Sequence, residues 1–264
     1  MPWKIGLVQI NSNAMNYLPY SVGLLQAYAQ KYLSQPESFE FLLPIHKPVS
    51  LAQARWFFRE ADLVGFSTYM WNFKRTLALA QAVKEANPQV LIVFGGPQVP
   101  DRAEDFLRAH PFIDLCVHGE GEATFLKILE QIETRDWQAI PGISYLSGEQ
   151  FVHNPKAARI KDLNTIPSPY LSGVFDRLIQ SQLKPVKWSA MWESNRGCPF
   201  SCSFCDWGSA VQSKVYSFDL ERLYAEIDWF VKHQLEFVFC CDANFGILPR
   251  DVQLAEYLAQ TKQE

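Results

Sequence analysis

Short apolar segments alternate with segments of helical periodicity through the first half of the chain. Apolar runs rich in Ile, Leu, Val and Phe predict buried strands at residues 3–10, 39–45, 63–68, 90–94 and 113–117. Between them, apolar residues recur at helical spacing, and the helix after the third strand is predicted to stop at Asn87-Pro88. Repeated β–α units of this length predict an α/β fold: a doubly wound parallel sheet with helices on both faces.

The pattern changes after residue 140. A small hairpin is predicted at 141–152, followed by a segment that contains Pro155, Pro167 and Pro169 and has little periodicity. Strands are then predicted at 186–193 and 236–241, and helices after Ser217, the predicted N-cap, and at 251–260. The first of these helices is predicted to bury its apolar face, which includes Val231. This order is typical of the start of a β/α barrel. The predicted organisation is a sheet domain at 1–140, a hairpin and linker at 141–185, and a partial barrel at 186–264.

Ligands of a doubly wound sheet bind at the carboxyl ends of its strands, where the strand order reverses. The loops expected to line a ligand site are therefore 11–16, 67–72, 95–97 and 119–122. None of them contains the G-x-G-x-x-G pattern of dinucleotide sites or the G-K-[ST] pattern of nucleotide triphosphate sites. The paired glycines Gly95 and Gly96 would let the backbone approach a bulky ligand, or would only form a tight turn.

Composition and charge narrow the function classes. A formal net charge of -4 gives no electrostatic support for a nucleic-acid partner. No uninterrupted apolar stretch approaches ~20 residues, the length that spans a membrane. The first residues show no cleavage-like pattern, and the cysteines form no disulfide framework. The sequence therefore predicts a cytoplasmic protein.

Three cysteines stand at the spacing C-x3-C-x2-C directly after a predicted barrel strand: Cys198, Cys202 and Cys205. Thiolates at short intervals on one loop can converge on a soft metal centre. A structural zinc site usually has four protein ligands, whereas three leave one coordination position free for a reactive group. The alternatives are a zinc loop completed by His233 or Cys240, or three unrelated buried thiols.

With Phe204 just before its last cysteine, this motif resembles that of the radical S-adenosylmethionine (SAM) superfamily. The resemblance implies that the three cysteines hold a [4Fe-4S] cluster, that SAM binds its fourth iron, and that Phe204 lies near the adenine. The Gly-Gly-Glu pattern that usually follows the next strand of the family is absent. Asp242 and Asn244 offer oxygen acceptors there instead, as candidate contacts for SAM.

Four blocks of the first half resemble the cobalamin-binding (B12-binding) domain of B12-dependent radical SAM proteins: 62–67, 71–72, 93–97 and 119–122. The resemblance implies a Rossmann-like cobalamin site whose residues are Ser67, Tyr69, Trp71, Gly95, Gly96, Pro97, Gly119 and Glu120. None of the five histidines has Asp two residues before it, so no histidine is expected on the lower face of the cobalt. Trp71 is the candidate for that face, or it packs under a loop. Tyr69 and Trp71 alternate along the chain, so their side chains are expected to face the same side.

The resemblance implies an enzyme, most simply a methyltransferase that acts on an unactivated carbon through a 5′-deoxyadenosyl radical and methylcobalamin. An external electron donor and a small-molecule or peptide substrate would be its partners. The rivals are rearrangement or cyclisation without methyl transfer, a non-catalytic cofactor-binding protein, and a flavodoxin-like domain holding flavin. Residues 186–264 hold fewer β/α units than the barrel of the family. We therefore expect a fragment with little turnover by itself.

Overall fold

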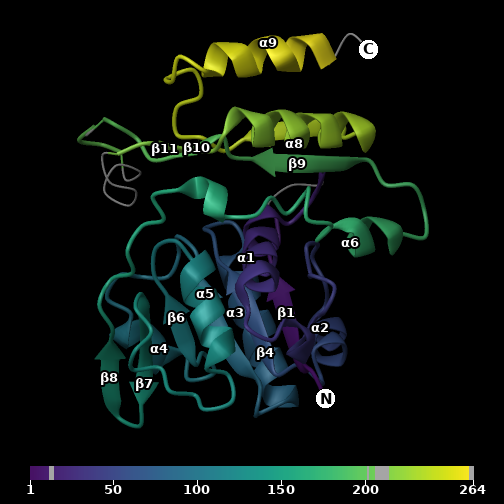
Figure 1. Cartoon of the computed structure of the whole chain (residues 1–264). Coiled ribbons are helices and arrows are strands. Elements are labelled where there is room, and N and C mark those ends of the chain that lie inside the picture. The colour runs from purple at the N-terminus through teal and green to yellow at the C-terminus, as the bar shows by residue number, and fades with distance from the viewer. Residues whose placement is uncertain (12–14, 201, 206–213, 262–264) are drawn as a thin grey trace. The chain divides into compact units, whose positions relative to one another are not determined.

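The computed structural model describes residues 1–11, 15–200, 202–205 and 214–261. The chain divides into two compact units (Figure 1). The first unit comprises Met1–Ala14 and Ser21–Arg159, and the second comprises Met15–Tyr20 and Ile160–Glu264. Each is described by itself.

The first unit is built on a seven-stranded sheet with the order β3-β1-β4-β5-β6-β7-β8. Its strands are β1 (Trp3–Val8), β3 (Phe39–Phe41), β4 (Leu63–Ser67), β5 (Leu91–Gly95), β6 (Leu115–Val117), β7 (Ile143–Ser147) and β8 (Gln150–His153). The strands from β3 to β6 are parallel, which confirms the predicted parallel sheet. The predicted hairpin is β7 and β8, and β7 extends the sheet by antiparallel pairing with β6.

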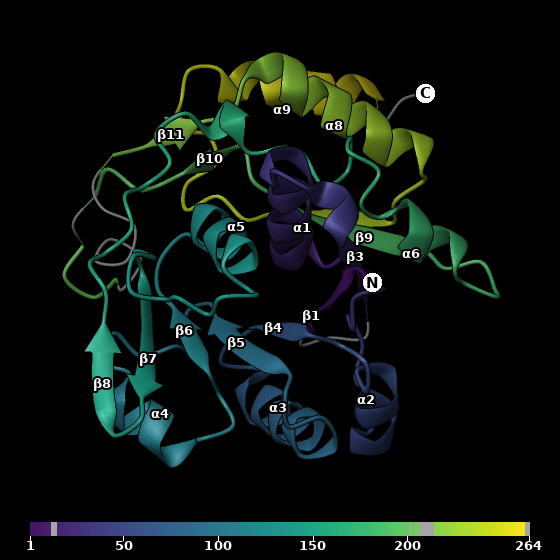
Figure 2. The same cartoon turned by 60° about the horizontal axis from the view of Figure 1, so that its bottom comes forward.

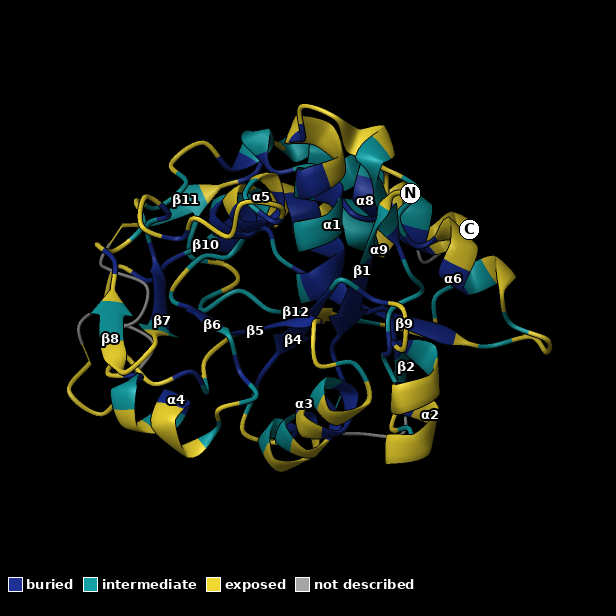
Figure 3. Ribbon diagram, turned by 90° about the horizontal axis from the view of Figure 1, so that it is seen from below, coloured by how far each residue is buried: buried dark blue, intermediate teal, exposed yellow. Residues whose placement is uncertain are grey.

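Helices cover both faces of this sheet, as Figure 2 shows. They are α1 (Tyr20–Tyr32), α2 (Leu51–Phe57), α3 (Phe73–Ala86), α4 (Glu104–Ala109) and α5 (Glu122–Glu130), with a short 3-10 turn, η1, at Pro36–Ser38. One core cluster packs α1 and α5 on one face, and a second packs α2, α3 and α4 on the other. The alternating side chains of the strands supply both clusters, so the central strands are buried while the outer side of α3 is exposed (Figure 3). The fold is doubly wound, as predicted.

Strand order reverses at β1. The chain passes from β1 to its neighbour β3 and then returns to the other side of β1 as β4. The carboxyl ends of β1 and β4 therefore flank the switch point at which this class of fold binds ligands. In the loop after β1, which the sequence singled out at 11–16, positions 12–14 lie outside the described residues.

The second unit contains a three-stranded parallel sheet with the order β12-β9-β2. Its elements are β2 (Asn16–Tyr17), η2 (Leu163–Thr165), α6 (Asp176–Gln180), β9 (Trp188–Trp192), β10 (Asn195–Arg196), β11 (Tyr216–Ser217), α8 (Leu220–Lys232), β12 (Phe237–Cys240) and α9 (Asp251–Thr261). The unit β9–α8–β12 is the predicted start of a β/α barrel. Strand β2 was not predicted, because two residues that pair with a strand far along the chain carry no periodicity of their own.

Two details of the prediction for α8 are wrong. Ser217 lies in β11, and the N-cap of α8 is Asp219, whose extended backbone precedes the first helical residue. The Val231 side chain, expected in the core, is 49% exposed, while Glu226 on the same helix is buried. No helix within the described ranges is long and apolar enough to cross a membrane.

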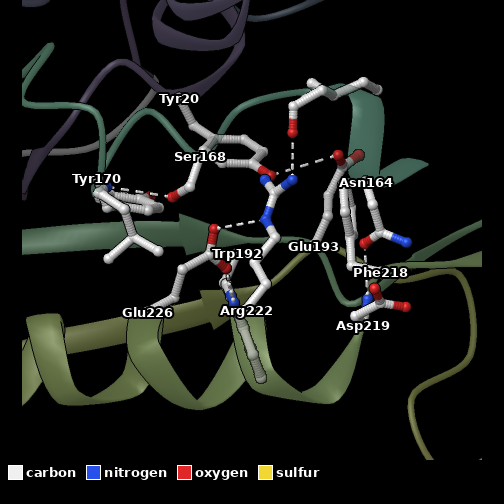
Figure 4. A network of polar contacts seen from close by, with 12 residues as sticks. Tyr20, Asn164, Ser168, Tyr170, Trp192, Glu193, Phe218, Asp219, Arg222 and Glu226 are labelled. Atoms are coloured by element: carbon white, nitrogen blue, oxygen red, sulfur yellow. Dashed lines mark hydrogen bonds and ion pairs between the residues drawn. The ribbon is translucent and has the colours of Figure 1, made fainter. Parts of the chain in front are cut away.

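The buried Glu226 carboxylate fixes the packing of α8 against β9 (Figure 4). Its Oε2 accepts a hydrogen bond of 2.7 Å from Trp192 Nε1, and its Oε1 accepts one of 3.1 Å from Arg222 Nε. Arg222 also donates to the carbonyl of Ile166, and its guanidinium lies 4.0 Å from the centre of the Phe218 ring. One ion pair thus joins the helix, the strand and the proline-rich segment before them.

Candidate functional site

Asn72 joins the two loops at the switch point of the first unit. This buried amide donates from Nδ2 to the carbonyls of Ile10 and Ser67, both at 3.0 Å, and its Oδ1 accepts from Tyr69 N at 2.8 Å. Ile10 follows β1 and Ser67 ends β4, so one side chain fixes the carboxyl ends of both strands. The sequence singled out Asn72 only as part of a motif, because the pairing of loops so far apart in the chain is not visible locally.

The glycine loop after β5 is tied to the same region. Gly96 has φ of 101°, and a Cβ at this position would stand 2.6 Å from the carbonyl oxygen of Thr68. The Thr68 hydroxyl donates to the Gly95 carbonyl at 2.8 Å, and its backbone N donates to the same oxygen at 2.7 Å. Gly96 is therefore required for a close approach of two backbones as well as for its positive φ.

Two aromatic rings follow β4. Tyr69 and Trp71 stack with ring centroids 4.6 Å apart and an interplanar angle of 8°. The Tyr69 hydroxyl lies 3.0 Å from Ser21 Oγ at the start of α1, which holds the pair in place. The Trp71 side chain is 50% exposed, so it does not fit the alternative of an aromatic packed under a loop. The predicted common orientation of the two rings is confirmed.

The loop after β6 contains the remaining candidates of the first unit. Gly119 has φ of 76° and open space where a Cβ would stand, and Glu120 Oε1 lies 3.7 Å from Arg159 Nε. The preceding His118 was not among the predicted site residues. Its Nε2 lies 2.8 Å from Ser144 Oγ, and burial lowers its pKa, so the ring stays neutral at neutral pH. Pro97, after β5, is exposed.

In the second unit, the cysteine segment is a loop closed at its base. Strands β10 and β11 pair antiparallel on either side of it. Gly197 has φ of 116°, and a Cβ there would stand 2.3 Å from the carbonyl oxygen of Lys214, so the two ends of the loop meet at a position that only glycine fits. The predicted ligand Cys198 is buried just inside this closure, whereas Cys202 and Cys205 are exposed, and all three are free thiols.

The loop after β12 holds the base of the cysteine loop. Both carboxylate oxygens of Asp242 accept hydrogen bonds from Ser194 and Asn195, including one of 2.7 Å from Ser194 N and one of 2.9 Å from Asn195 Nδ2. Arg250 donates to the carbonyls of Ser194 at 2.6 Å and Phe218 at 2.5 Å, one before and one after the cysteine loop. Sequence reasoning assigned Asp242 to this loop but could not show its partners.

Asn244 lies in the same loop, and its Nδ2 is 3.2 Å from Cys198 Sγ. The structure thus brings Asn244 and Cys198 together. Phe204, between the other two cysteines, is 91% exposed.

Among the described residues, no three His, Cys, Asp or Glu side chains are grouped closely enough to hold a metal ion, and this includes the three cysteines of the motif, so the described geometry does not distinguish a zinc site from a cluster. The ring of His233 stacks on Trp229 and bonds its carbonyl at 2.9 Å. Burial raises the pKa of Cys240 and of Cys241 to about 12, so both stay protonated, as expected for cysteines that pack as small apolar residues.

Comparisons with known proteins show what the chain is similar to. Residues 49–129 match the family described as B12 binding domain. The chain is 42% identical, over 97% of its length, to the cobalamin-dependent radical SAM methyltransferase TokK of Streptomyces tokunonensis. Nearly the whole chain is thus similar to a cobalamin-dependent radical SAM methyltransferase, and part of its first unit matches a B12 binding domain. A 2-(S-pantetheinyl)-carbapenam-3-carboxylate methyltransferase of Streptantibioticus cattleyicolor is 41% identical over 96% of this chain.

Solved structures of cobalamin-binding radical SAM enzymes share the fold. The cobalamin-dependent S-adenosylmethionine radical enzyme OxsB, with aqua-cobalamin and SAM bound, superposes with a TM-score of 0.74 at 18% identity, over 100% of this chain and 37% of its own. The radical SAM methyltransferase TsrM of Kitasatospora setae, with cobalamin and a [4Fe-4S] cluster bound, superposes with a TM-score of 0.73 at 17% identity, over 100% of this chain and 52% of its own. The chain spans 38% of the length of each of the two methyltransferase relatives.

The donor set of the cysteine loop fits an iron–sulfur cluster. It presents three free thiols, two of them exposed, on a segment whose two ends are fixed by Gly197 and the loop after β12. Thiolates are the ligands that iron–sulfur clusters take. The first unit fits a large flat ligand, since exposed stacked rings and glycine backbone lie at its strand ends.

Proposed function

We propose that this chain binds cobalamin, a [4Fe-4S] cluster and SAM, and serves a radical SAM methyltransferase that acts on an unactivated carbon. The observation that carries the proposal is its identity of 41–42%, over nearly its whole length, with two proteins named as methyltransferases. The cysteine loop supports the proposal, because Cys198, Cys202 and Cys205 supply three thiols and leave one position of a four-iron cluster for SAM.

Some residues of the second unit would hold the cluster, and others would orient SAM. The three cysteines hold the cluster, which when bound supplies the electron that cleaves SAM. Phe204 and Asn244 are the proposed contacts of SAM. Both oxygens of Asp242 are engaged by Ser194 and Asn195, so Asp242 supports SAM through the loop it fixes rather than through a free carboxylate.

The proposed cobalamin site is the strand-end surface of the first unit. Gly95, Gly96 and Gly119 offer backbone without side chains, and Ser67 ends the strand beside them. Pro97 and Glu120 complete the proposed contacts. The Tyr69–Trp71 stack offers an apolar face, and a tryptophan cannot coordinate cobalt, because its indole N–H is a donor and not an acceptor. We infer that Trp71 would cover the lower face of the cobalt in bound cobalamin and would keep a lower ligand away.

Replacing Trp71 with alanine is expected to change the absorption spectrum of bound cob(III)alamin toward that of a cobalt with an added lower ligand, because water gains access to that face. The matched control is Trp56→Ala, which removes another exposed tryptophan of the same unit, on α2. The control is expected to leave the spectrum unchanged. An unchanged spectrum for Trp71→Ala, with cobalamin still bound, would contradict the assignment.

The proposed setting is the cytoplasm, where free thiols stay reduced, with an external electron donor and a small-molecule or peptide substrate. No nucleic acid or membrane is proposed as a partner. The name of the second relative suggests a first substrate class for an assay, a carbapenam carboxylate with an S-pantetheinyl group.

Cofactor content and reaction products test the proposal. After anaerobic reconstitution, the chain is expected to contain iron, sulfide and cobalamin, and zinc alone would contradict the proposal. With SAM, a reductant and substrate, methyl transfer yields S-adenosylhomocysteine together with 5′-deoxyadenosine. A relative named as an anaerobic magnesium-protoporphyrin IX monomethyl ester cyclase, from Rubrivivax gelatinosus, is 29% identical over 69% of this chain. Cyclisation without methyl transfer would give no S-adenosylhomocysteine.

A further inference from the structure

The Asn244 amide is directed at the sulfur of a proposed cluster ligand. Its Nδ2 lies 3.2 Å from Cys198 Sγ, which is within hydrogen-bond distance for a sulfur acceptor. A cysteine that ligates iron is a thiolate and carries no proton, so it can only accept. The side-chain amide of Asn244 is therefore a donor that stays suited to Cys198 after the cluster has formed.

The loop that bears Asn244 is fixed on both sides of it. Before it, the carboxylate of Asp242 is bonded to Ser194 and Asn195. After it, the buried carboxylate of Asp251 accepts from Gly246 N at 2.9 Å and from Leu248 N at 3.0 Å. The Asn244 amide is thus held toward Cys198 by hydrogen bonds that do not involve the sulfur. Little conformational entropy is therefore lost when the amide donates to the sulfur.

We propose that Asn244 donates a hydrogen bond to the Cys198 thiolate and thereby raises the reduction potential of the cluster. Hydrogen bonds to the sulfurs are among the features that set the potential of an iron–sulfur cluster. Reduction makes the ligating sulfur more negative, so a donor stabilises the reduced state more than the oxidised state. This inference rests on the proposed function, because it requires that Cys198 ligates a cluster.

The test is a redox titration of the reconstituted chain in the absence of SAM, followed by the electron paramagnetic resonance signal of the reduced cluster. Asn244→Ala removes the donor and is expected to shift the midpoint potential to a more negative value. Asn244→Asp keeps the size of the side chain but replaces the donor with a negative charge, and is expected to shift the midpoint at least as far. Gln182→Ala, which removes an amide of the same unit that bonds the Leu178 carbonyl, is the control and is expected to leave the midpoint unchanged.

Iron and sulfide are measured before each titration, which separates two kinds of failure. A wild-type chain without a cluster would overturn the proposed function and this inference with it. A wild-type chain and an Asn244→Ala variant with equal iron and equal midpoints would overturn only the inference. The same holds if the variant loses affinity for SAM while the midpoint stays, since Asn244 would then serve SAM alone. Should Asn244→Ala hold no cluster, the isosteric Asn244→Asp variant is titrated in its place. A more negative midpoint potential than that of the wild type supports the inference, and an unchanged midpoint overturns it.

Discussion

Replacement of Cys198 with alanine is expected to abolish cluster binding, so that iron after anaerobic reconstitution falls from about four per chain to nearly none. The loop offers three thiols, and two thiolates cannot hold a cubane that also keeps one iron open for SAM. Cys198 is the thiol that the fold has already positioned, between the Gly197 closure and the Asn244 amide. The loss of the cluster is measured by its visible absorption and by the iron and sulfide content.

The other cysteines of the second unit provide the control. Cys240→Ala and Cys241→Ala are expected to keep the full iron content, because both thiols are partly buried on or beside β12 and their pKa values are raised to about 12. Cys202→Ala and Cys205→Ala are expected to behave as Cys198→Ala does. Loss of metal on replacing Cys240, together with bound zinc in the wild type, would instead restore the zinc alternative.

The sequence predicted those parts of the fold that depend on the local pattern of apolar and polar residues. The parallel strands β1, β3, β4, β5 and β6 are apolar runs with helices between most of them, and the right-handed rule for such connections leaves few topologies. The cysteine motif is also local, because ligand spacing on one loop is a property of a few adjacent residues. The sequence also singled out Gly96 at its strand end from local pattern alone, and this residue has a positive φ.

The parts that sequence missed depend on partners far along the chain. Asn72 bonds the loops after β1 and β4, and nothing near Asn72 shows which carbonyls lie within its reach. Strand β2 exists because Asn16–Tyr17 pairs with β9, across more than half of the chain. On α8, periodicity placed Val231 in the core by its apolar character, but the helix buries Glu226 instead, since Trp192 and Arg222 supply its hydrogen bonds.

Replacing Glu226 with alanine is therefore expected to lower the free energy of unfolding of the second unit by about 3–5 kcal/mol, the range for breaking a buried ion pair by removing one partner. The Arg222 guanidinium, 13% exposed, would lose its carboxylate and keep its charge, and the buried Trp192 N–H would lose its acceptor. Glu226→Gln retains an oxygen for Trp192 and is expected to cost less than alanine does. Urea denaturation followed by circular dichroism measures the loss.

The control for this prediction is Glu221→Ala, on the exposed side of the same helix. Removal of this exposed carboxylate from the first turn of the helix is expected to lower the free energy of unfolding by about 1 kcal/mol or less. Both variants remove a glutamate from α8, and Glu221→Ala also removes a carboxylate from its first turn, so a loss for Glu226→Ala that exceeds the control reports the burial and pairing of Glu226. Equal losses for the two variants would show that the Glu226–Arg222–Trp192 contacts of Figure 4 do not hold the unit together.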